Sequence, residues 1–183
     1  LEETPDATVA TDVTTVPWVG QCDLIVTATS AFGQRVLDVS QCKPGAVILD
    51  VALPPDISAQ EAAVRPDVLI VESGEVLIPG PVDFSFNIGL PPHVAYACLA
   101  EAALLAMEQR FECFTLGRDV HPDRVKEIYR LFRKHDFRIA PLRTFGQLLT
   151  DELVAEKRAR ADELLRDPAR LARVKAEAGE KMA

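Results

Sequence analysis

Cys98 is the residue whose type and surroundings best suit nucleophilic chemistry. It follows a Gly/Pro-rich stretch and lies among small residues such as Ala97 and Ala100, so its thiol would not be covered by bulky neighbours. We expect it about two turns into a helix, where the helix dipole lowers a thiol pKa only weakly. His93 is then the nearest residue that could assist it. The alternative is a packed core cysteine, which is the more frequent arrangement.

The other cysteines, Cys22, Cys42 and Cys113, are interpreted as structural. No two of the four form a CxxC pair, and none clusters with histidine at the spacing of a metal site. We therefore predict no metal. A cytosolic chain of this size also disfavours disulfides.

Four short runs rich in β-branched residues suggest strands in the first half of the chain. They cover residues 7–13, 23–29, 46–51 and 67–71, and the second and third are almost continuously apolar. Strands buried on both faces of a parallel sheet have this composition. The segments between them are long enough for crossover connections. The pattern predicts an α/β fold, part of a Rossmann-like doubly wound parallel sheet, with helices towards the C-terminus.

Ligands of open α/β sheets bind outside the carboxyl ends of the strands. Small and turn-forming residues follow the second and third predicted strands. A turn-rich loop without a ligand explains the same residues equally well. The candidate cofactor-binding residues at this edge are Thr27, Ala28, Thr29, Ser30, Asp50 and Val51.

A dinucleotide-binding fold begins with a strand, a glycine-rich turn and a helix that holds the pyrophosphate. No GxGxxG motif occurs in this sequence. We therefore expect the first βαβ unit to precede Leu1 and the 183 residues to be the C-terminal piece of something longer.

The second half predicts an irregular Gly/Pro-rich segment up to Pro92, a helix from there to about residue 111, and a second helix over 122–135. A short strand is predicted within 137–142. From Phe145 onwards the pattern is helical, with a break at Asp167 and Pro168. We divide the chain into residues 1–142, the C-terminal part of a catalytic domain, and residues 143–183, a helical extension.

The net charge of −8 is concentrated in the first ninety residues, which carry thirteen acidic and three basic side chains. This distribution disfavours nucleic acid and anionic membranes as partners, because both require a basic surface. No apolar run approaches the length of a membrane span, and the N-terminus is acidic where a signal peptide is basic. We predict a cytoplasmic protein.

Three motifs resemble the long-chain fatty acyl-ACP reductases. Asn87-Ile88-Gly89 matches a "DIG"-like turn, Ala97 to Leu105 matches the helix pattern A-C-x-A-E-A-x-L-L, and Phe114, Gly117 and Arg118 match F-x-x-G-R. The resemblance runs from about Asp23 to Leu142. Weaker similarity links DLIVTATS and ILDVALP to NADP domains of the shikimate dehydrogenase and glutamyl-tRNA reductase type.

This resemblance implies an NADPH-dependent oxidoreductase that converts a fatty acyl thioester, carried by ACP or CoA, to a fatty aldehyde. It implies Cys98 as the nucleophile that forms the enzyme thioester. Backbone N–H groups from Ile88 to Leu90 are candidates for stabilising the oxyanion, and Gly89 is a candidate cofactor contact. In the implied mechanism His93 and Tyr96 are candidates for donating the proton to the aldehyde oxygen.

Two other functions remain open at this stage. One is an NADP-dependent dehydrogenase of the shikimate or glutamyl-tRNA reductase type, in which the cysteine is incidental. The other is a Rossmann-like interaction module without catalysis. A homo-oligomer is compatible with all three functions.

Overall fold

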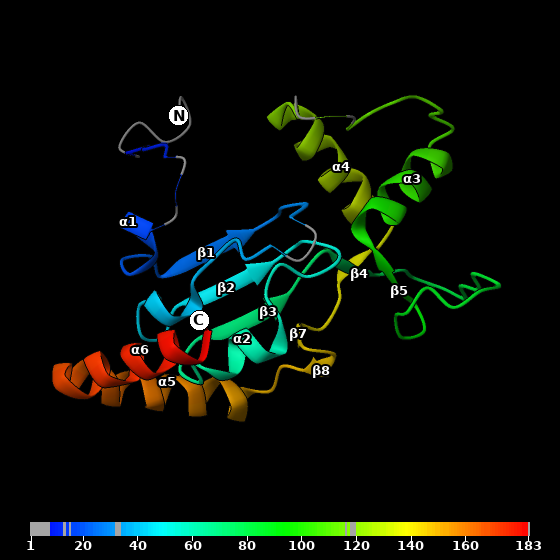
Figure 1. Cartoon of the computed structure of the whole chain (residues 1–183). Coiled ribbons are helices and arrows are strands. Elements are labelled where there is room, and N and C mark those ends of the chain that lie inside the picture. The colour runs from blue at the N-terminus through cyan, green and yellow to red at the C-terminus, as the bar shows by residue number, and fades with distance from the viewer. Residues whose placement is uncertain are drawn as a thin grey trace. The chain divides into compact units, whose positions relative to one another are not determined.

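The computed structural model describes residues 8–12, 14, 16–31, 34–115, 117 and 120–182 (Figure 1). The chain divides into two compact units. Unit 1 combines Leu1–Glu72 with Arg143–Ala183, and unit 2 is Ser73–Leu142. The structure thus groups the residues after Leu142 with the first seventy-two, whereas the sequence analysis had set 1–142 apart from 143–183.

Unit 1 contains a five-stranded sheet in the order β1-β2-β3-β7-β8. Strands β1 (Leu24–Thr27), β2 (Val47–Asp50) and β3 (Leu69–Glu72) are parallel, with Leu24 opposite Val47 and Val47 opposite Leu69. Strands β7 (Arg143–Thr144) and β8 (Gln147–Leu148) continue it antiparallel. The expected α/β class with parallel strands is confirmed.

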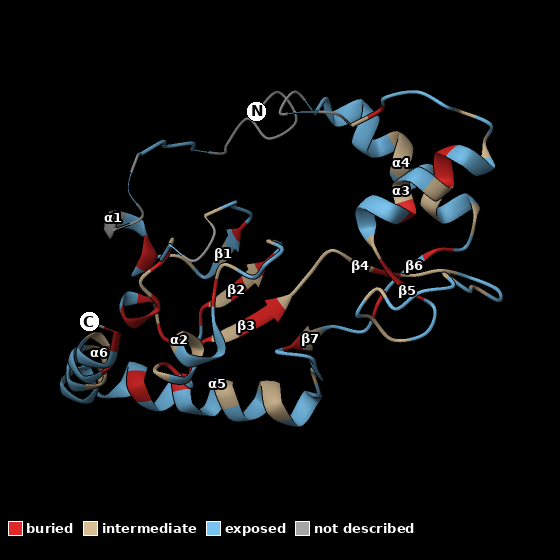
Figure 2. Cartoon of the chain, turned by 45° about the vertical axis from the view of Figure 1, so that its right-hand side comes forward, coloured by how far each residue is buried: buried red, intermediate tan, exposed pale blue. Residues whose placement is uncertain are grey.

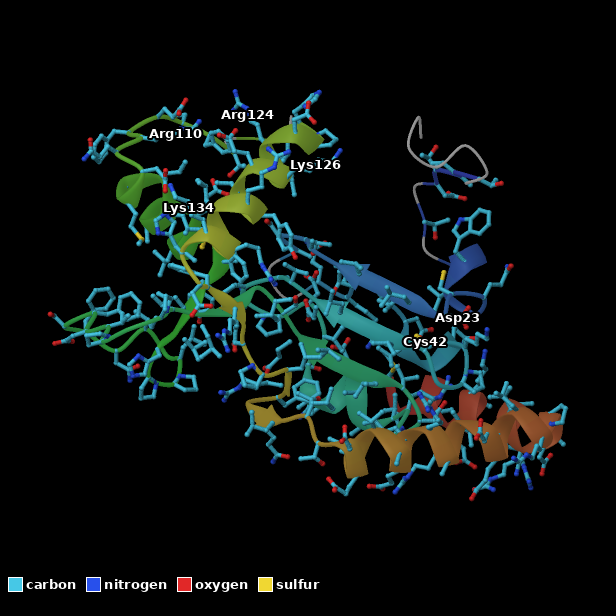
Figure 3. The ribbon with its side chains drawn as sticks, turned by 180° about the vertical axis from the view of Figure 1, so that it is seen from behind. Asp23, Cys42, Arg110, Arg124, Lys126 and Lys134 are labelled. Carbon is cyan, nitrogen blue, oxygen red and sulfur yellow. The ribbon has the colours of Figure 1, made fainter. Side chains whose placement is uncertain are left out.

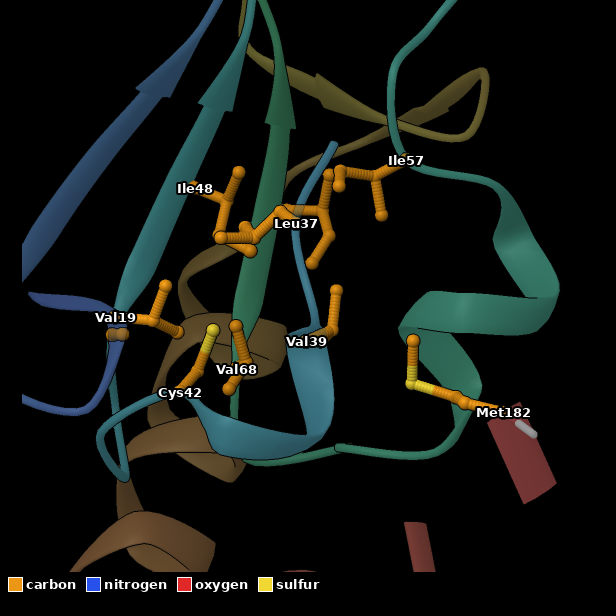
Figure 4. Close-up of a cluster of buried hydrophobic side chains, with 10 residues drawn as sticks. Val19, Leu37, Val39, Cys42, Ile48, Ile57, Val68 and Met182 are labelled. Carbon is orange, nitrogen blue, oxygen red and sulfur yellow. The ribbon is translucent and has the colours of Figure 1, made fainter. Parts of the chain in front are cut away.

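One face of this sheet carries the main hydrophobic core. Ile48 and Ile70 point to it and meet Val39, Cys42 and Met182, all buried (Figure 4). Met182 belongs to the last helix, so the C-terminal segment completes the core built by the first seventy residues. The helical elements of unit 1 are α1 (Val16–Val19), the 3-10 turn η1 (Val39–Gln41), α2 (Ala59–Ala63), α5 (Asp151–Arg166) and α6 (Pro168–Met182).

A buried ion pair between Arg65 and Asp67 holds two connecting segments of unit 1 together. Arg65 is fully buried and donates two hydrogen bonds to the Asp67 carboxylate, at 2.8 and 2.7 Å. Its remaining nitrogen donates to the carbonyls of Ser40 and Cys42, at 2.7 and 2.9 Å. The guanidinium therefore ties the turn before β3 to η1, and its bidentate geometry offsets the cost of burying two charges.

Unit 2 is a smaller α/β unit. Its antiparallel sheet has the order β5-β4-β6, from β4 (Glu75–Leu77), β5 (Val94–Tyr96) and β6 (Arg138–Ile139). Helices α3 (Ala97–Met107) and α4 (Pro122–Lys134) pack together on a core of Val76, Ala100, Leu104 and Phe137. This core has far fewer fully buried side chains than that of unit 1.

Several sequence expectations shift in the structure. Residues 8–12 have no regular structure where a strand over 7–13 was predicted, and residues 7 and 13 lie outside the described residues. The helix expected from Pro92 begins only at Ala97, because Val94–Tyr96 pairs with β4. Within the described residues, no helix is both long and apolar enough to cross a membrane.

Candidate functional site

Cys98 lies in the first turn of α3, one turn closer to the helix start than the sequence suggested. Tyr96 is the N-cap residue, in an extended conformation with ψ of 141° and without a side-chain capping bond. The Ala97 N–H is held by the Gly74 carbonyl at 2.7 Å, which anchors the helix start to β4. The first turn holds no acidic side chain, so the positive end of the helix dipole acts on an exposed thiol unopposed from within that turn.

A shallow hollow of about 440 Å³ lies beside Cys98. Its wall on α3 is Cys98, Glu101, Ala102 and Leu105, and the opposite wall is the segment from Arg110 to Thr115. Cys113 belongs to that segment and is also exposed, so two thiols line one hollow. Cys113 had been interpreted as structural, and the structure places it at the surface instead.

The loop wall of the hollow is held by charged and aromatic contacts. The Arg110 guanidinium lies 4.7 Å from the centre of the Phe114 ring, and that of Arg124 lies 5.3 Å from it (both arginines are labelled in Figure 3). Arg110 also donates to Glu112 at 2.7 Å and to Glu127, and these hydrogen bonds raise the pKa of Arg110. The hollow is therefore lined by both charged and apolar side chains, with Glu101, Glu112 and the paired Arg110 beside Leu105 and Phe114.

His93 and Tyr96 do not contact the thiol through any hydrogen bond among the described residues. The His93 backbone has a φ of 63°, which is unusual for a residue with a side chain. Its Nδ1 lies 3.0 Å from the Gly80 carbonyl, and because a carbonyl only accepts, Nδ1 carries the proton. In the neutral ring Nε2 is then free to accept a proton. Tyr96 is half-buried at the end of β5.

At the carboxyl edge of the parallel sheet, polar side chains form hydrogen bonds with one another and with nearby backbone N–H groups. The Thr27 hydroxyl donates to Asp50 at 3.0 Å, and the same carboxylate accepts the N–H groups of Ala52 and Ile57 at 3.1 and 3.0 Å. Thr29 bonds Asp56 through both its N–H and its hydroxyl. Thr27, Thr29 and Asp50 thus hold the strand ends and the loop after β2 together.

The other predicted cofactor residues are exposed or belong to unit 2. Ala28, Ser30 and Val51 are exposed. Gly89 belongs to unit 2, has a φ of 81° and donates its N–H to the Asn87 side chain at 2.7 Å. A hollow of about 320 Å³ beside this edge is lined by other residues: Gln34, Arg35, Pro54, Pro55, Asp56, Ser58 and Glu61.

Comparison with known proteins finds no matching family profile. The chain is 39% identical over 137 residues to the aminotransferase PigE of Serratia sp. (strain ATCC 39006). The alignment covers 73% of this chain but 16% of the relative, so the chain spans about a sixth of that protein's length.

This finding corrects the fatty acyl-ACP reductase interpretation, which is wrong. The relative is named an aminotransferase, a transferase, so the NADPH-dependent reductase, the NADPH cofactor and the fatty aldehyde product are set aside. The ACP and CoA partners depended on the same resemblance. The match also gives no support to a dehydrogenase or a non-catalytic module. The alanine-rich pattern from Ala97 to Leu105 misled because high helix propensity produces it in unrelated helices. Arg118 of the third motif lies outside the described residues.

Aminotransferases use pyridoxal phosphate, which binds covalently to a lysine. A separate acidic or basic side chain contacts the pyridine nitrogen of the cofactor. The lysines of this chain do not fit that role. Lys157 is half-buried, and burial lowers its pKa, but its amine donates to the carbonyls of Pro66 and Val68 at 3.2 and 2.9 Å. The nearby Asp67 has both carboxylate oxygens bonded to Arg65.

The remaining lysines are no better placed. Burial lowers the pKa of Lys175, whose amine donates to the Gln41 carbonyl at 2.9 Å. Lys43 pairs with Asp23 and Lys134 with Glu108, while Lys126 and Lys181 are exposed on helices. These residues do not provide a pyridoxal phosphate site.

Proposed function

We propose that this chain is one module of a larger protein that transfers amino groups, and that its own task is to hold a carbonyl substrate at Cys98. The similarity to a much longer aminotransferase, of which the alignment covers 16%, supports the first part. The lysines described above argue that the cofactor is bound by another part of such a protein. A carbonyl compound is the acceptor in amino-group transfer, so a module that holds one would serve the same reaction.

The observation that carries the proposal is the position of Cys98. It is exposed, in the first turn of an eleven-residue helix, and lines a hollow with apolar side chains on both walls, Ala102 and Leu105 on one and Phe114 on the other. An exposed thiol is accessible to a carbonyl carbon, and apolar side chains favour the carbon chain of a substrate. Cys42 is the opposite case, since burial raises the pKa of its thiol to about 11.

The proposed step is a reversible addition. The Cys98 sulfur forms a bond to the carbonyl carbon, the carbonyl π electrons move to the oxygen, and the proton released by the thiol ends on that oxygen. Nothing is oxidised or reduced and no group leaves. We assign His93 and Tyr96 to carrying that proton, as a base through the free Nε2 of His93 or as a donor through the Tyr96 hydroxyl.

Competition for the thiol tests this proposal. Each cysteine's rate of alkylation by iodoacetamide is followed by peptide mass spectrometry, with and without hexanal. We expect hexanal to slow alkylation of Cys98 by about tenfold once it occupies roughly nine sites in ten, and to leave Cys113 unchanged. Hexanol, which has the same chain but no carbonyl, serves as the control compound.

Cys113 is a matched internal control because it is exposed and lines the same hollow. In Cys98→Ser hexanal should leave the alkylation rates of the remaining cysteines unchanged, and the circular dichroism spectrum should match that of the unchanged chain. Equal protection of Cys98 and Cys113, or none at all, would contradict the proposal.

We also propose the finer fold assignment, a Rossmann-like doubly wound sheet, for unit 1. The parallel register of β1, β2 and β3 and the crossover segments containing η1 and α2 support it. In this assignment the first βαβ unit lies outside the residues of this chain.

A further inference from the structure

Cys98 and Cys113 are two exposed thiols that line one hollow of unit 2. Cys98 comes from α3, and Cys113 from the segment that connects α3 to α4, whose described residues are mostly exposed (Figure 2). The other two cysteines belong to unit 1, where Cys22 is half-buried and Cys42 is buried. Two of the four thiols of the chain therefore share one surface.

Two hydrogen bonds tether the connecting segment to α3. The Arg110 N–H donates to the Leu105 carbonyl at 2.8 Å. Further along the segment, the Thr115 hydroxyl donates to the Glu101 carboxylate. The segment thus runs along α3 towards the helix start, and its second tether lies near the end of α3 that carries Cys98.

The second tether sets where the two cysteines lie along the hollow. Cys98 and Glu101 are three positions apart on one face of α3, so their Cβ atoms are about 5–6 Å apart. Cys113 and Thr115 are two positions apart, which is at most about 7 Å of chain. A disulfide requires Cα atoms within about 7 Å of each other. A shift of the segment towards α3 brings the pair into this range.

Few buried contacts hold the part of the segment that would make this shift. Phe111 is 86% exposed, and Glu112 and Cys113 are exposed too. The next residue, Phe114, is buried, with the guanidinium groups of Arg110 and Arg124 against its ring. An exposed stretch beside a fixed anchor rearranges at little cost in free energy, because it breaks few packing contacts.

We propose that Cys98 and Cys113 form a reversible disulfide that closes the hollow and removes Cys98 from carbonyl binding. The oxidant is a low-molecular-weight disulfide of the glutathione class. The sulfur of one cysteine bonds to a sulfur of this disulfide, and one small thiol leaves. The sulfur of the other cysteine then displaces the second small thiol. The two cysteines together lose two electrons and two protons, and the small disulfide is reduced to two thiols.

Access decides which thiols take part in this exchange. Burial raises the pKa of the Cys42 thiol to about 11, so almost no Cys42 thiolate is available to attack a disulfide near neutral pH. One bridge is therefore expected, and not a mixture of pairings. Its regulatory role rests on the proposed function of Cys98, whereas its formation does not.

A redox titration of the 183-residue chain tests the inference. The chain is equilibrated at micromolar concentration with mixtures of oxidised and reduced glutathione, and free thiols are then blocked with iodoacetamide in urea. Arg110 lies between the two cysteines, so trypsin places them in separate peptides that only the bridge holds together for mass spectrometry. Because closure is intramolecular, we expect the Cys98–Cys113 bridge to be at least about tenfold more abundant than any other pairing.

A second measurement tests the link to carbonyl binding. Hexanal added before oxidised glutathione should slow formation of the bridge by about tenfold at nine-tenths occupancy, because one sulfur cannot serve both reactions. Hexanol should leave the rate unchanged. Cys22→Ser is the matched control variant, since it removes a half-buried thiol of unit 1 and should leave the abundance of the bridge unchanged.

The outcomes separate this inference from the proposed function. Absence of the bridge, or equal pairing of Cys98 with Cys22 or with a second chain, would overturn the inference alone if hexanal still protects Cys98 from alkylation. A bridge that forms at the same rate with hexanal, in a chain whose Cys98 hexanal does not protect, would overturn both the regulatory role and the proposed function.

Discussion

Unit 1 buries polar and reactive side chains that unit 2 leaves exposed. In unit 1 Arg65, Asp67 and Asp50 are buried with every partner in place, and the Cys42 thiol is sealed in the core. In unit 2 Cys98 and Cys113 are exposed beside a hollow. The difference indicates that unit 1 uses its polar chemistry for stability, while unit 2 leaves its reactive groups accessible.

The largest effect should come from breaking the buried ion pair of unit 1. Arg65→Met leaves the Asp67 carboxylate buried without its partner, which should cost about 4 kcal/mol of unfolding free energy. Urea titration followed by the fluorescence of Trp18, the single tryptophan and a unit 1 residue, measures this. Exchange rates in α3 and α4 should change little. An equal loss of stability in both units would show that they unfold together, and the contrast drawn between the two units would then be wrong.

A somewhat smaller loss is expected from the core of unit 2. Leu104 is 1% exposed between Val76 and Phe137, so Leu104→Ala should cost about 3 kcal/mol through lost burial and the cavity it leaves. Hydrogen exchange of α3 reports this loss. The Trp18 transition should stay in place, and a shift of that transition by the same amount would argue against separate units.

The smallest effect is a pH dependence confined to unit 2. Hydrogen bonds from Lys134 and His135 lower the pKa of the Glu108 carboxyl. A carboxyl whose pKa is lower in the folded state stabilises it above the ordinary pKa, and this contribution is lost as the pH falls through the folded-state pKa. The protection factors of α3 and α4, which correct for the intrinsic pH dependence of amide exchange, should therefore fall below about pH 4.5. Glu108→Gln should flatten that dependence, and an unchanged profile would assign it to another group.

Local sequence patterns predicted much of the secondary structure. The apolar runs at 23–29, 46–51 and 67–71 became β1, β2 and β3, and His121-Pro122 begins α4 as expected. The break at Asp167 and Pro168 separates α5 from α6. These elements depend on residue order and on proline and capping chemistry, which act over a few neighbours.

The candidate site was less predictable. Thr27 and Asp50 were expected to meet a ligand, but their oxygens are occupied by each other and by the loop after β2. Cys98 was placed too deep in its helix, because the pairing of Val94–Tyr96 with β4 decides where α3 begins. Lys157 and Arg65 were overlooked, since their partners are backbone carbonyls that no sequence pattern marks.

The order of residues alone settled where strands and helices form, because helix capping and hydrophobic periodicity are short-range. Only the tertiary structure decided that the last forty residues complete the core of the first seventy, and that one sulfur is sealed while another meets solvent. Burial and partner choice join segments more than a hundred residues apart, as Met182 against Val39 illustrates, and nothing within either segment specifies the other.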